Sequence, residues 1–217
     1  SGLTTTGATV ISGLDYLPDG LLLWRSILQW LGGIGIIVVA MVFLPELRVG
    51  GMQIFKSEGF DTFGKILPRA TEIAAQVAWL YVGLTGACAV LYIATGMRSF
   101  DAVLHAMTTI ATGGFSTYDS SFVKFGASTE YAAVVFMCLA ALPFVRYVQL
   151  INGAPSSLFH DSQVRVFFIV LLVTVGFLTL VLWQGYQFSG ELGFRKALFN
   201  VVSITTGTGY ASAERTC

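Results

Sequence analysis

Three stretches of this 217-residue sequence carry no charged side chain and are long enough to cross a lipid bilayer. They are residues 26–45, 73–97 and 166–190, of 20, 25 and 25 residues. A window of about 18 or more apolar residues indicates a membrane span, because a helix that rises about 1.5 Å per residue then covers a hydrocarbon core of about 30 Å. The sequence therefore predicts an all-α integral membrane protein.

Charged side chains are scarce along the whole chain. Lys and Arg number 12, Asp and Glu number 12, and together they make up 11% of the residues, while hydrophobic residues make up 55%. An ordinary soluble domain is about 25% charged. This composition excludes a water-soluble globule, a disordered tail and a basic nucleic-acid-binding domain, so no nucleic acid is expected as a partner. The three cysteines show neither a disulfide framework nor zinc-ligand spacing, and no covalently bound cofactor is expected.

We expect four helices to cross the membrane, so that the chain alternates between its two sides. They are residues 21–47, 73–97, 131–151 and 166–186, with Pro143 expected to bend the third. Four Lys and Arg residues lie in the connection 47–72, and Arg165 lies in 152–165 with Arg146 close by; such residues favour the cytoplasmic side. The outer side is then expected to hold the segments 1–20, 98–130 and 187–217.

The outer segments are too apolar to be ordinary solvated loops. Charge-free windows of 14, 17 and 17 residues occupy 1–14, 102–118 and 197–213. Residues 102–107 and 194–204 have the pattern of short helices, and Ser99 or Asp101 lies near the start of the first. Apolar segments of about 10 to 14 residues are too short to span and fit re-entrant segments. Non-helical backbone at membrane depth is tolerated only where it is buried in protein or lines a water-filled cavity.

A Thr-Gly pair recurs in each outer segment, at residues 6–7, 112–113 and 208–209. The copies are 106 and 96 residues apart, and the same order of span, basic loop, span and short helix lies between them. One Thr-Gly loop carries little information, because both residues are common in membrane helices and turns. Three copies at matching places on one side of the membrane indicate an internal repeat.

This repeat suits the passage of a cation. A cation that crosses hydrocarbon must exchange its water shell for other oxygens, and backbone carbonyls supply them without adding a fixed charge. Glycine permits the backbone angles that direct successive carbonyls to one axis, and threonine adds a hydroxyl acceptor. The carboxyl end of a preceding short helix adds about half a negative charge near the ion. The three loops are therefore expected to line an ion pathway.

Five stretches of this chain resemble the TrkH-type membrane subunits of bacterial Trk potassium uptake systems, in the Trk/Ktr/HKT superfamily. They are 1–9 (SGLTTTGAT), 28–36 (LQWLGGIGI), 49–53 (VGGMQ), 110–117 (IATGGFST) and 199–203 (FNVVS), the last followed by Gly209 and Tyr210. The resemblance implies four helix–pore helix–filter loop–helix repeats around one potassium path, as in a potassium channel. It also implies a multi-pass protein of the bacterial inner membrane, a homodimer, and gating by a cytosolic nucleotide-binding ring of the RCK type.

The resemblance implies that K⁺ is coordinated by three residues from each loop. They are Thr5, Thr6 and Gly7 in the first, Ala111, Thr112 and Gly113 in the second, and Gly207, Thr208 and Gly209 in the third. Family members usually have Thr where this chain has Gly207. Relatives with Ser in place of a filter glycine tend toward sodium, so Gly7, Gly113 and Gly209 favour potassium, and a sodium or mixed permease remains the alternative.

The resemblance divides the chain into parts of three repeats, which makes it a piece of a longer protein. Residues 1–46 close the first repeat, 73–151 form the second and 166–217 begin the third, with cytoplasmic loops at 47–72 and 152–165. The chain also starts without Met and stops abruptly after the third loop. The fourth repeat and the family's gating loop are therefore expected to lie outside it.

Two other functions and one charged residue are weighed against this interpretation. An intramembrane hydrolase would need a nucleophile with a base, but His105 and His160 are expected on opposite sides of the membrane. A non-conducting assembly subunit would have no reason to repeat Thr-Gly three times. Arg146 lies inside the third predicted span, where it would either snorkel or form an ion pair, or act as a gate or pore-field residue.

Overall fold

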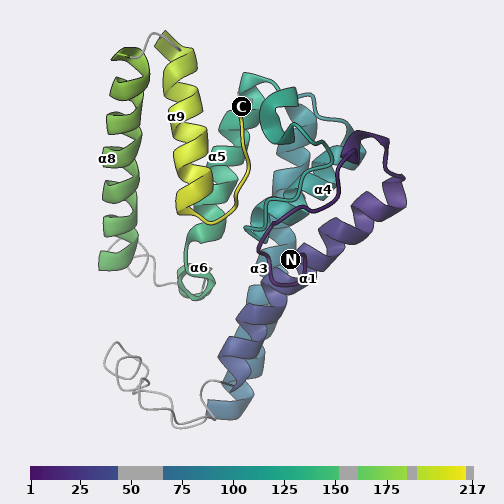
Figure 1. The fold of residues 1–217 in the computed structure, drawn as a ribbon. Coiled ribbons are helices and arrows are strands. Elements are labelled where there is room, and N and C mark those ends of the chain that lie inside the picture. The colour runs from purple at the N-terminus through teal and green to yellow at the C-terminus, as the bar shows by residue number, and fades with distance from the viewer. Residues whose placement is uncertain (44–65, 152–160, 185–189, 214–217) are drawn as a thin grey trace.

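The chain folds into long helices and shorter ones that pack against them, as the computed structural model of residues 1–43, 66–151, 161–184 and 190–213 shows (Figure 1). Within these ranges, only the backbone is described for residues 36–43 and 66–72. The elements are η1 (Leu14–Tyr16), α1 (Asp19–Phe43), α3 (Ile66–Ala94), α4 (Ser99–Ile110), η2 (Ser121–Lys124), α5 (Ala127–Ala141), α6 (Phe144–Ile151), α8 (Ser162–Gln184) and α9 (Gly190–Thr205). These residues contain no strand, so the all-α prediction is confirmed.

Each short helix packs back against the long helix that precedes it. α4, with 12 residues, returns along α3, and α9, with 16 residues, returns along α8 (Figure 1). At about 1.5 Å per residue, neither reaches across a hydrocarbon core of about 30 Å. Both predicted short helices are confirmed, although each begins earlier than expected. The first thirteen residues form a turn and irregular backbone, and not a third short helix.

Two helices in the described part of the chain are long and apolar enough to span a membrane. They are Ile73–Ala94 within α3 and Ser162–Gln184, which is α8. α1 has 25 residues, about 37 Å at the usual rise, which matches the length of a span. α3 begins at Ile66, before the predicted start at 73, whereas Arg48, Lys56 and Lys65 of the predicted cytoplasmic loop lie outside the described residues.

The third predicted span, 131–151, is not one continuous helix. α5 ends at Ala141, α6 begins at Phe144, and the two axes differ by 86°. Pro143 has no backbone N–H to continue α5, and it forces Leu142 out of the helical region, to φ −78° and ψ 148°. The predicted bend at Pro143 is therefore confirmed. The 15 residues of α5 extend only about 22 Å, so α5 and α6 together form either a broken span or a re-entrant segment.

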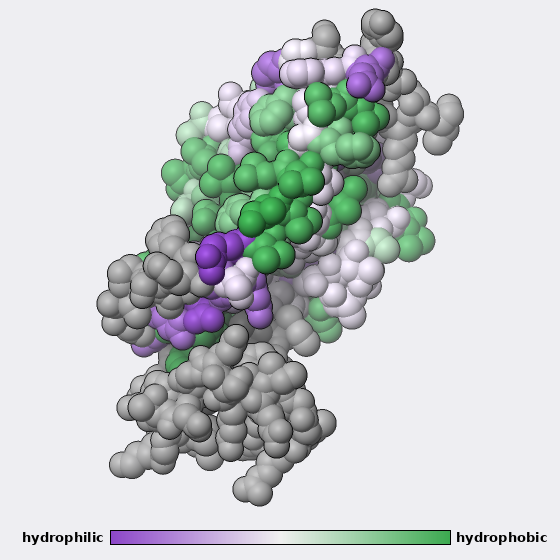
Figure 2. All heavy atoms as spheres, turned by 90° about the vertical axis from the view of Figure 1, so that its left-hand side faces the viewer, coloured by the Kyte–Doolittle hydropathy of each residue, from purple (hydrophilic) through white to green (hydrophobic). Residues whose placement is uncertain are grey.

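α8 presents an unusually apolar surface. Only 17% of its residues are buried within the protein, and Figure 2 shows hydrophobic side chains gathered on the face that carries this helix. The exposed side chains are Val166, Phe168, Ile169, Val170, Leu172, Val173, Phe177, Leu180, Val181 and Trp183. Exposing such a face to water would cost free energy, whereas lipid tails are as apolar as these side chains. The surface therefore agrees with a helix in contact with lipid.

An ion cluster with a fully enclosed carboxylate joins α5 to α9. The Glu130 side chain, 1% exposed, lies 2.6 Å from Arg195 Nη1 and 2.6 Å from Lys196 Nζ. Lys196 Nζ also donates to the carbonyl oxygen of Ser212, beyond the end of α9. Because the three charges are shielded from solvent together, the two cations depend on the one carboxylate that they share.

Glu130→Gln should destabilise the protein strongly, because it leaves Lys196 shielded without a carboxylate partner and Arg195 with only the exposed Glu191. We expect the free energy of unfolding to fall by about 3 to 5 kcal/mol, the usual cost of breaking a buried ion pair. Thermal unfolding in detergent measures the loss. The matched control is Glu191→Gln, whose carboxylate is 60% exposed and lies 3.0 Å from Arg195. The control should cost less than about 1 kcal/mol, and equal losses would contradict the assignment.

Candidate functional site

The three Thr/Gly segments share one backbone conformation. We call residues 4–7 loop 1, residues 111–114 loop 2 and residues 206–209 loop 3. In each loop the second and fourth residues have positive φ: 52° and 73° in loop 1, 48° and 71° in loop 2, 79° and 83° in loop 3. The residues concerned are Thr5 and Gly7, Thr112 and Gly114, and Gly207 and Gly209. The internal repeat is therefore present in the structure as well as in the sequence.

This shared conformation corrects the alignment of loop 2 by one residue. The repeated angles place Thr112 107 residues after Thr5 and Gly207 95 residues after Thr112. The predicted offsets of 106 and 96 are wrong, and the counterpart of Gly7 and Gly209 is Gly114, not Gly113. The sequence offers two adjacent glycines at this point, and only their backbone angles distinguish them.

A hydroxyl contact repeated in all three loops supports the same register. In each, a Ser or Thr hydroxyl donates to the carbonyl oxygen of the residue seven positions later, which is the residue after the loop. The three pairs are Ser1 with Ala8 (2.6 Å), Thr108 with Phe115 (2.8 Å) and Ser203 with Tyr210 (2.8 Å). The sequence analysis missed these residues, although a hydroxyl six residues before each loop's last residue is visible once the register is known.

The N–H groups of the loops are directed back at the preceding turn or helix end. Thr112 N donates to Thr109 O (3.0 Å) and Gly113 N to Thr108 O (2.9 Å). Loop 1 repeats both bonds, with Thr5 N to Gly2 O (2.9 Å) and Thr6 N to Ser1 O (3.0 Å). Loop 3 repeats the first, with Gly207 N to Ile204 O (3.1 Å), and its fourth residue donates the second, from Gly209 N to Ser203 O (3.1 Å). In a trans peptide the carbonyl preceding each N–H points the opposite way. The carbonyl groups before these N–H groups therefore point away from the helix ends.

Two loops hold a threonine in a conformation that β-branched residues avoid. Thr5 and Thr112 have φ of 52° and 48°, where the left-handed region costs an L-residue roughly 1 to 2 kcal/mol. Such strain persists only where the surroundings enforce it, and it concentrates at functional sites. At the matching place loop 3 has Gly207, which adopts φ 79° without that cost.

The loops lie against one another in sequence order. A Cβ on Gly7 would overlap the carbonyl oxygen of Gly113, and a Cβ on Gly114 would overlap that of Thr208. Gly113 and Thr208 are counterparts, so the step from loop 1 to loop 2 is repeated from loop 2 to loop 3. A Cβ on Gly209 would meet nothing within 4 Å. The three loops thus form part of a ring, which is open beside loop 3 within the described residues.

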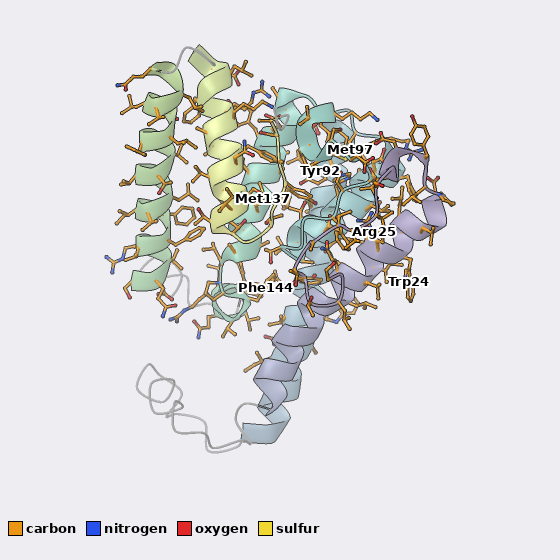
Figure 3. All side chains as sticks on the ribbon, in the orientation of Figure 1. Trp24, Arg25, Tyr92, Met97, Met137 and Phe144 are labelled. Atoms are coloured by element: carbon orange, nitrogen blue, oxygen red, sulfur yellow. The ribbon has the colours of Figure 1, made fainter. Side chains whose placement is uncertain are left out.

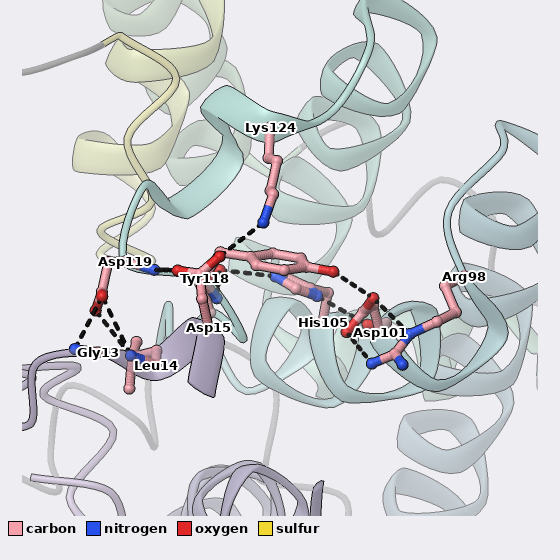
Figure 4. Close-up of polar contacts among 10 residues, drawn as sticks. Gly13, Leu14, Asp15, Arg98, Asp101, His105, Tyr118, Asp119 and Lys124 are labelled. Carbon is pink, nitrogen blue, oxygen red and sulfur yellow. Dashed lines mark hydrogen bonds and ion pairs between the residues drawn. The ribbon is translucent and has the colours of Figure 1, made fainter. Parts of the chain in front are cut away.

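Polar contacts also join the segments that follow loops 1 and 2, as Figure 4 shows. The Asp119 carboxylate accepts hydrogen bonds from the backbone of Gly13 (2.9 Å) and Leu14 (3.1 Å). Asp15 pairs with Lys124 at 2.6 Å, and the hydrogen bond from Lys124 holds the pKa of the Asp15 carboxyl below its ordinary value. Residues 104 to 109 positions apart in sequence are tied together here.

His105 of α4 packs inside the protein, as predicted. It is fully buried, and its two ring nitrogens lie 2.8 Å from Asp101 O and 3.0 Å from Ser116 Oγ (Figure 4). Asn200 of α9, 95 residues later, likewise joins its own helix to the segment after the loop. Its Nδ2 donates to Lys196 O (2.8 Å), and its Oδ1 accepts from Ser212 N (3.3 Å). Each short helix thereby holds the segment that follows its own loop.

Two arginines have definite partners. Arg146 of α6 lies 2.9 Å from Asp161, which agrees with the predicted ion pair; its alternative role as a gate or pore-field residue stays a prediction. Arg25 of α1 points into the protein, whereas Trp24 beside it points outward (Figure 3). Arg25 Nη2 lies 3.2 Å from Thr9 Oγ1, and its guanidinium lies 4.3 Å from the centre of the Phe115 ring. It therefore contacts the residues that follow loops 1 and 2.

Comparisons with known proteins agree on one family. Residues 1–215 match a family model described as TrkH, cation transport protein. Trk system potassium uptake protein TrkI of Halomonas elongata is 42% identical over 217 residues, which are 99% of this chain and 44% of that protein. TrkH of Escherichia coli K12 is 41% identical over 98% of this chain, which corresponds to 45% of the length of that protein. The crystal structure of the potassium transporter TrkH from Vibrio parahaemolyticus matches with a TM-score of 0.85 and 37% identity, over 98% of this chain and 43% of that one.

Gly114→Ala should destabilise the protein more than an alanine at a glycine with similar angles and free space. The new Cβ costs roughly 1 to 2 kcal/mol in the left-handed region, and its overlap with Thr208 O adds about 1 to 3 kcal/mol more. The matched control is Gly13→Ala, with φ 77° and nothing within 4 Å of the new Cβ. Thermal unfolding in detergent compares the two, and equal shifts would show that loops 2 and 3 are not in close contact.

Proposed function

This chain belongs to the TrkH family of cation transport proteins, and from that premise we propose that it forms part of a potassium pathway through a bacterial membrane. The relatives are named as potassium uptake proteins of Trk systems. The chain spans less than half the length of the relatives it matches, 44% and 45%. The activity proposed is therefore that of the whole protein in which these residues lie.

We propose that the three loops are the part of the pathway that selects the ion. The predicted coordinating residues are Thr5, Thr6, Gly7, Ala111, Thr112, Gly113, Gly207, Thr208 and Gly209; the corrected register adds Gly114. The observation that carries the proposal is the left-handed conformation of Thr5 and Thr112 at equivalent places in two loops. Strain repeated at one position of a repeat needs a reason, and directing a carbonyl at a shared axis supplies one.

The loop chemistry suits a dehydrated monovalent cation. Carbonyl oxygens from several loops replace water around the ion and carry no fixed charge that would trap it. α4 ends at Ile110 and α9 at Thr205, immediately before loops 2 and 3. Their carboxyl ends each contribute about half a negative charge toward the loops, which favours a cation over an anion.

The finer features of the assembly are proposed on the same basis. The open side of the ring beside Gly209 would accept a further loop, which fits a four-repeat pore in which these residues supply parts of three repeats. A homodimer, a cytosolic RCK-type nucleotide-binding ring and placement in the inner membrane follow from the resemblance. The family consists of transporters, which points away from an enzyme.

Uptake of K⁺ and Na⁺ by the protein at its full encoded length, reconstituted in liposomes, tests the proposal. We expect K⁺ uptake to exceed Na⁺ uptake. Similar uptake of both ions would favour the sodium or mixed permease, and uptake of neither would contradict the proposal.

Gly114→Ser should lower the ratio of K⁺ to Na⁺ uptake, because a side chain at this glycine displaces the carbonyl of Thr208 in the next loop. A fall of about tenfold corresponds to about 1.4 kcal/mol of lost discrimination. The matched control is Gly126→Ser, where a Cβ meets nothing within 4 Å and φ is −74°. The control should leave the ratio unchanged, and an unchanged ratio in Gly114→Ser would count against loop 2 as part of the filter.

A further inference from the structure

Loop 2 lacks a contact that loops 1 and 3 share. In loop 1 the hydroxyls of Thr4 and Thr6 lie 2.8 Å apart, and in loop 3 those of Thr206 and Thr208 lie 2.9 Å apart. These threonines occupy the first and third positions of their loops. The same positions in loop 2 are Ala111 and Gly113, which have no hydroxyl. Loop 2 therefore needs another means of fixing its third position.

The Gln29 carboxamide occupies that place. Gln29 lies on α1 and is fully buried. Its Nε2 donates to Gly113 O at 2.7 Å, and its Oε1 accepts a hydrogen bond from Phe115 N at 3.1 Å. One carboxamide thus holds the backbone on both sides of Gly114, the residue that lies against Thr208 of loop 3. These contacts join residues 84 and 86 positions apart.

The Gln29 carboxamide leaves no room for a residue larger than glycine at position 113. A Cβ on Gly113 would lie 2.6 Å from Gln29 Oε1 and 2.7 Å from Gln29 Nε2, well inside van der Waals contact. The Gln29 side chain, which comes from α1, thus fills the volume that a side chain at the third position of loop 2 would occupy. Glycine at 113 and glutamine at 29 depend on each other.

We propose that Gln29 is a positioning residue that sets the ion selectivity of loop 2, in the role that a threonine hydroxyl pair has in loops 1 and 3. A primary carboxamide presents a donor and an acceptor side by side, which is what a carbonyl and an N–H two residues apart require. Without it, Gly113 O and Phe115 N lose their buried partners, and the peptides around Gly114 are free to turn. This inference rests on the proposed function of the loops.

Gln29→Met tests the proposal, because methionine has a similar length and removes both the donor and the acceptor. Uptake is measured with the full-length protein in liposomes, with thermal unfolding in detergent as a separate measurement of folding. We expect the ratio of K⁺ to Na⁺ uptake to fall about tenfold, a scale that the loss of these two hydrogen bonds can supply. The control Gln163→Met, at an exposed glutamine of α8, should leave the ratio unchanged.

A compensating pair separates positioning from packing. Gly113→Ser alone places a side chain on the Gln29 carboxamide and should lower the ratio at least as much as Gln29→Met. In the double variant Gln29→Ala/Gly113→Ser, the alanine leaves room for the new hydroxyl, which supplies a donor and an acceptor in place of the carboxamide. We expect its ratio to return to within about threefold of the unchanged protein. This pair also decides the question if Gln29→Met protein does not fold.

The outcomes distinguish this inference from the proposed function. An unchanged protein that takes up no K⁺ would overturn the function of the loops. Selective K⁺ uptake that persists in Gln29→Met would overturn only the role of Gln29. The same holds if the effects of Gln29→Ala and Gly113→Ser multiply in the double variant, because residues that substitute for each other must couple.

Discussion

The close approach of one loop to the next is the constraint on which the rest of this structure depends. The Cα atoms of Gly7 and Gly114 each lie against a carbonyl oxygen of the following loop, where a Cβ has no room. That spacing brings backbone oxygens from separate repeats to one place, which ion coordination by carbonyls requires. It also explains why the fourth position of every loop is glycine: this residue must adopt positive φ, and in loops 1 and 2 it must also leave space for its neighbour.

Most of the surrounding polar contacts keep this arrangement in place. Hydroxyls of Ser1, Thr108 and Ser203 fix the carbonyl that follows each loop, while His105 and Asn200 hold the segments after loops 2 and 3. Aromatic side chains fill the space between repeats. The centre of the Tyr210 ring, just after loop 3, lies 4.5 Å from the centre of the Phe122 ring. The Tyr210 hydroxyl lies 2.6 Å from Thr108 Oγ1 of α4. Since each repeat is held by its neighbour, the position of a loop is not determined by its own repeat alone.

The repeats have the same backbone but not the same side chains. Thr112 and Gly207 occupy equivalent positions, and the hydroxyl pairs of loops 1 and 3 are replaced in loop 2 by Gln29. Such differences are compatible with one conformation because the third position of each loop has a polar partner, a threonine hydroxyl in loops 1 and 3 and the Gln29 carboxamide in loop 2. They also make an alignment of the repeats by sequence alone unreliable to within one residue. The sequence analysis, for example, matched Gly7 with Gly113, whereas its counterpart is Gly114.

The sequence by itself determined the features that depend on neighbouring residues: an all-α membrane protein, the order of long and short helices, the break near Pro143 and the three Thr/Gly loops. Apolar length, proline and glycine act locally, so their effects can be predicted from a single segment. Only the tertiary structure decided the register of loop 2, the 86° angle between α5 and α6, the order of the loops in the ring and the contacts of Gln29. These depend on groups that lie 84 or more residues apart in the chain or on how whole helices pack, and no local pattern records such distances.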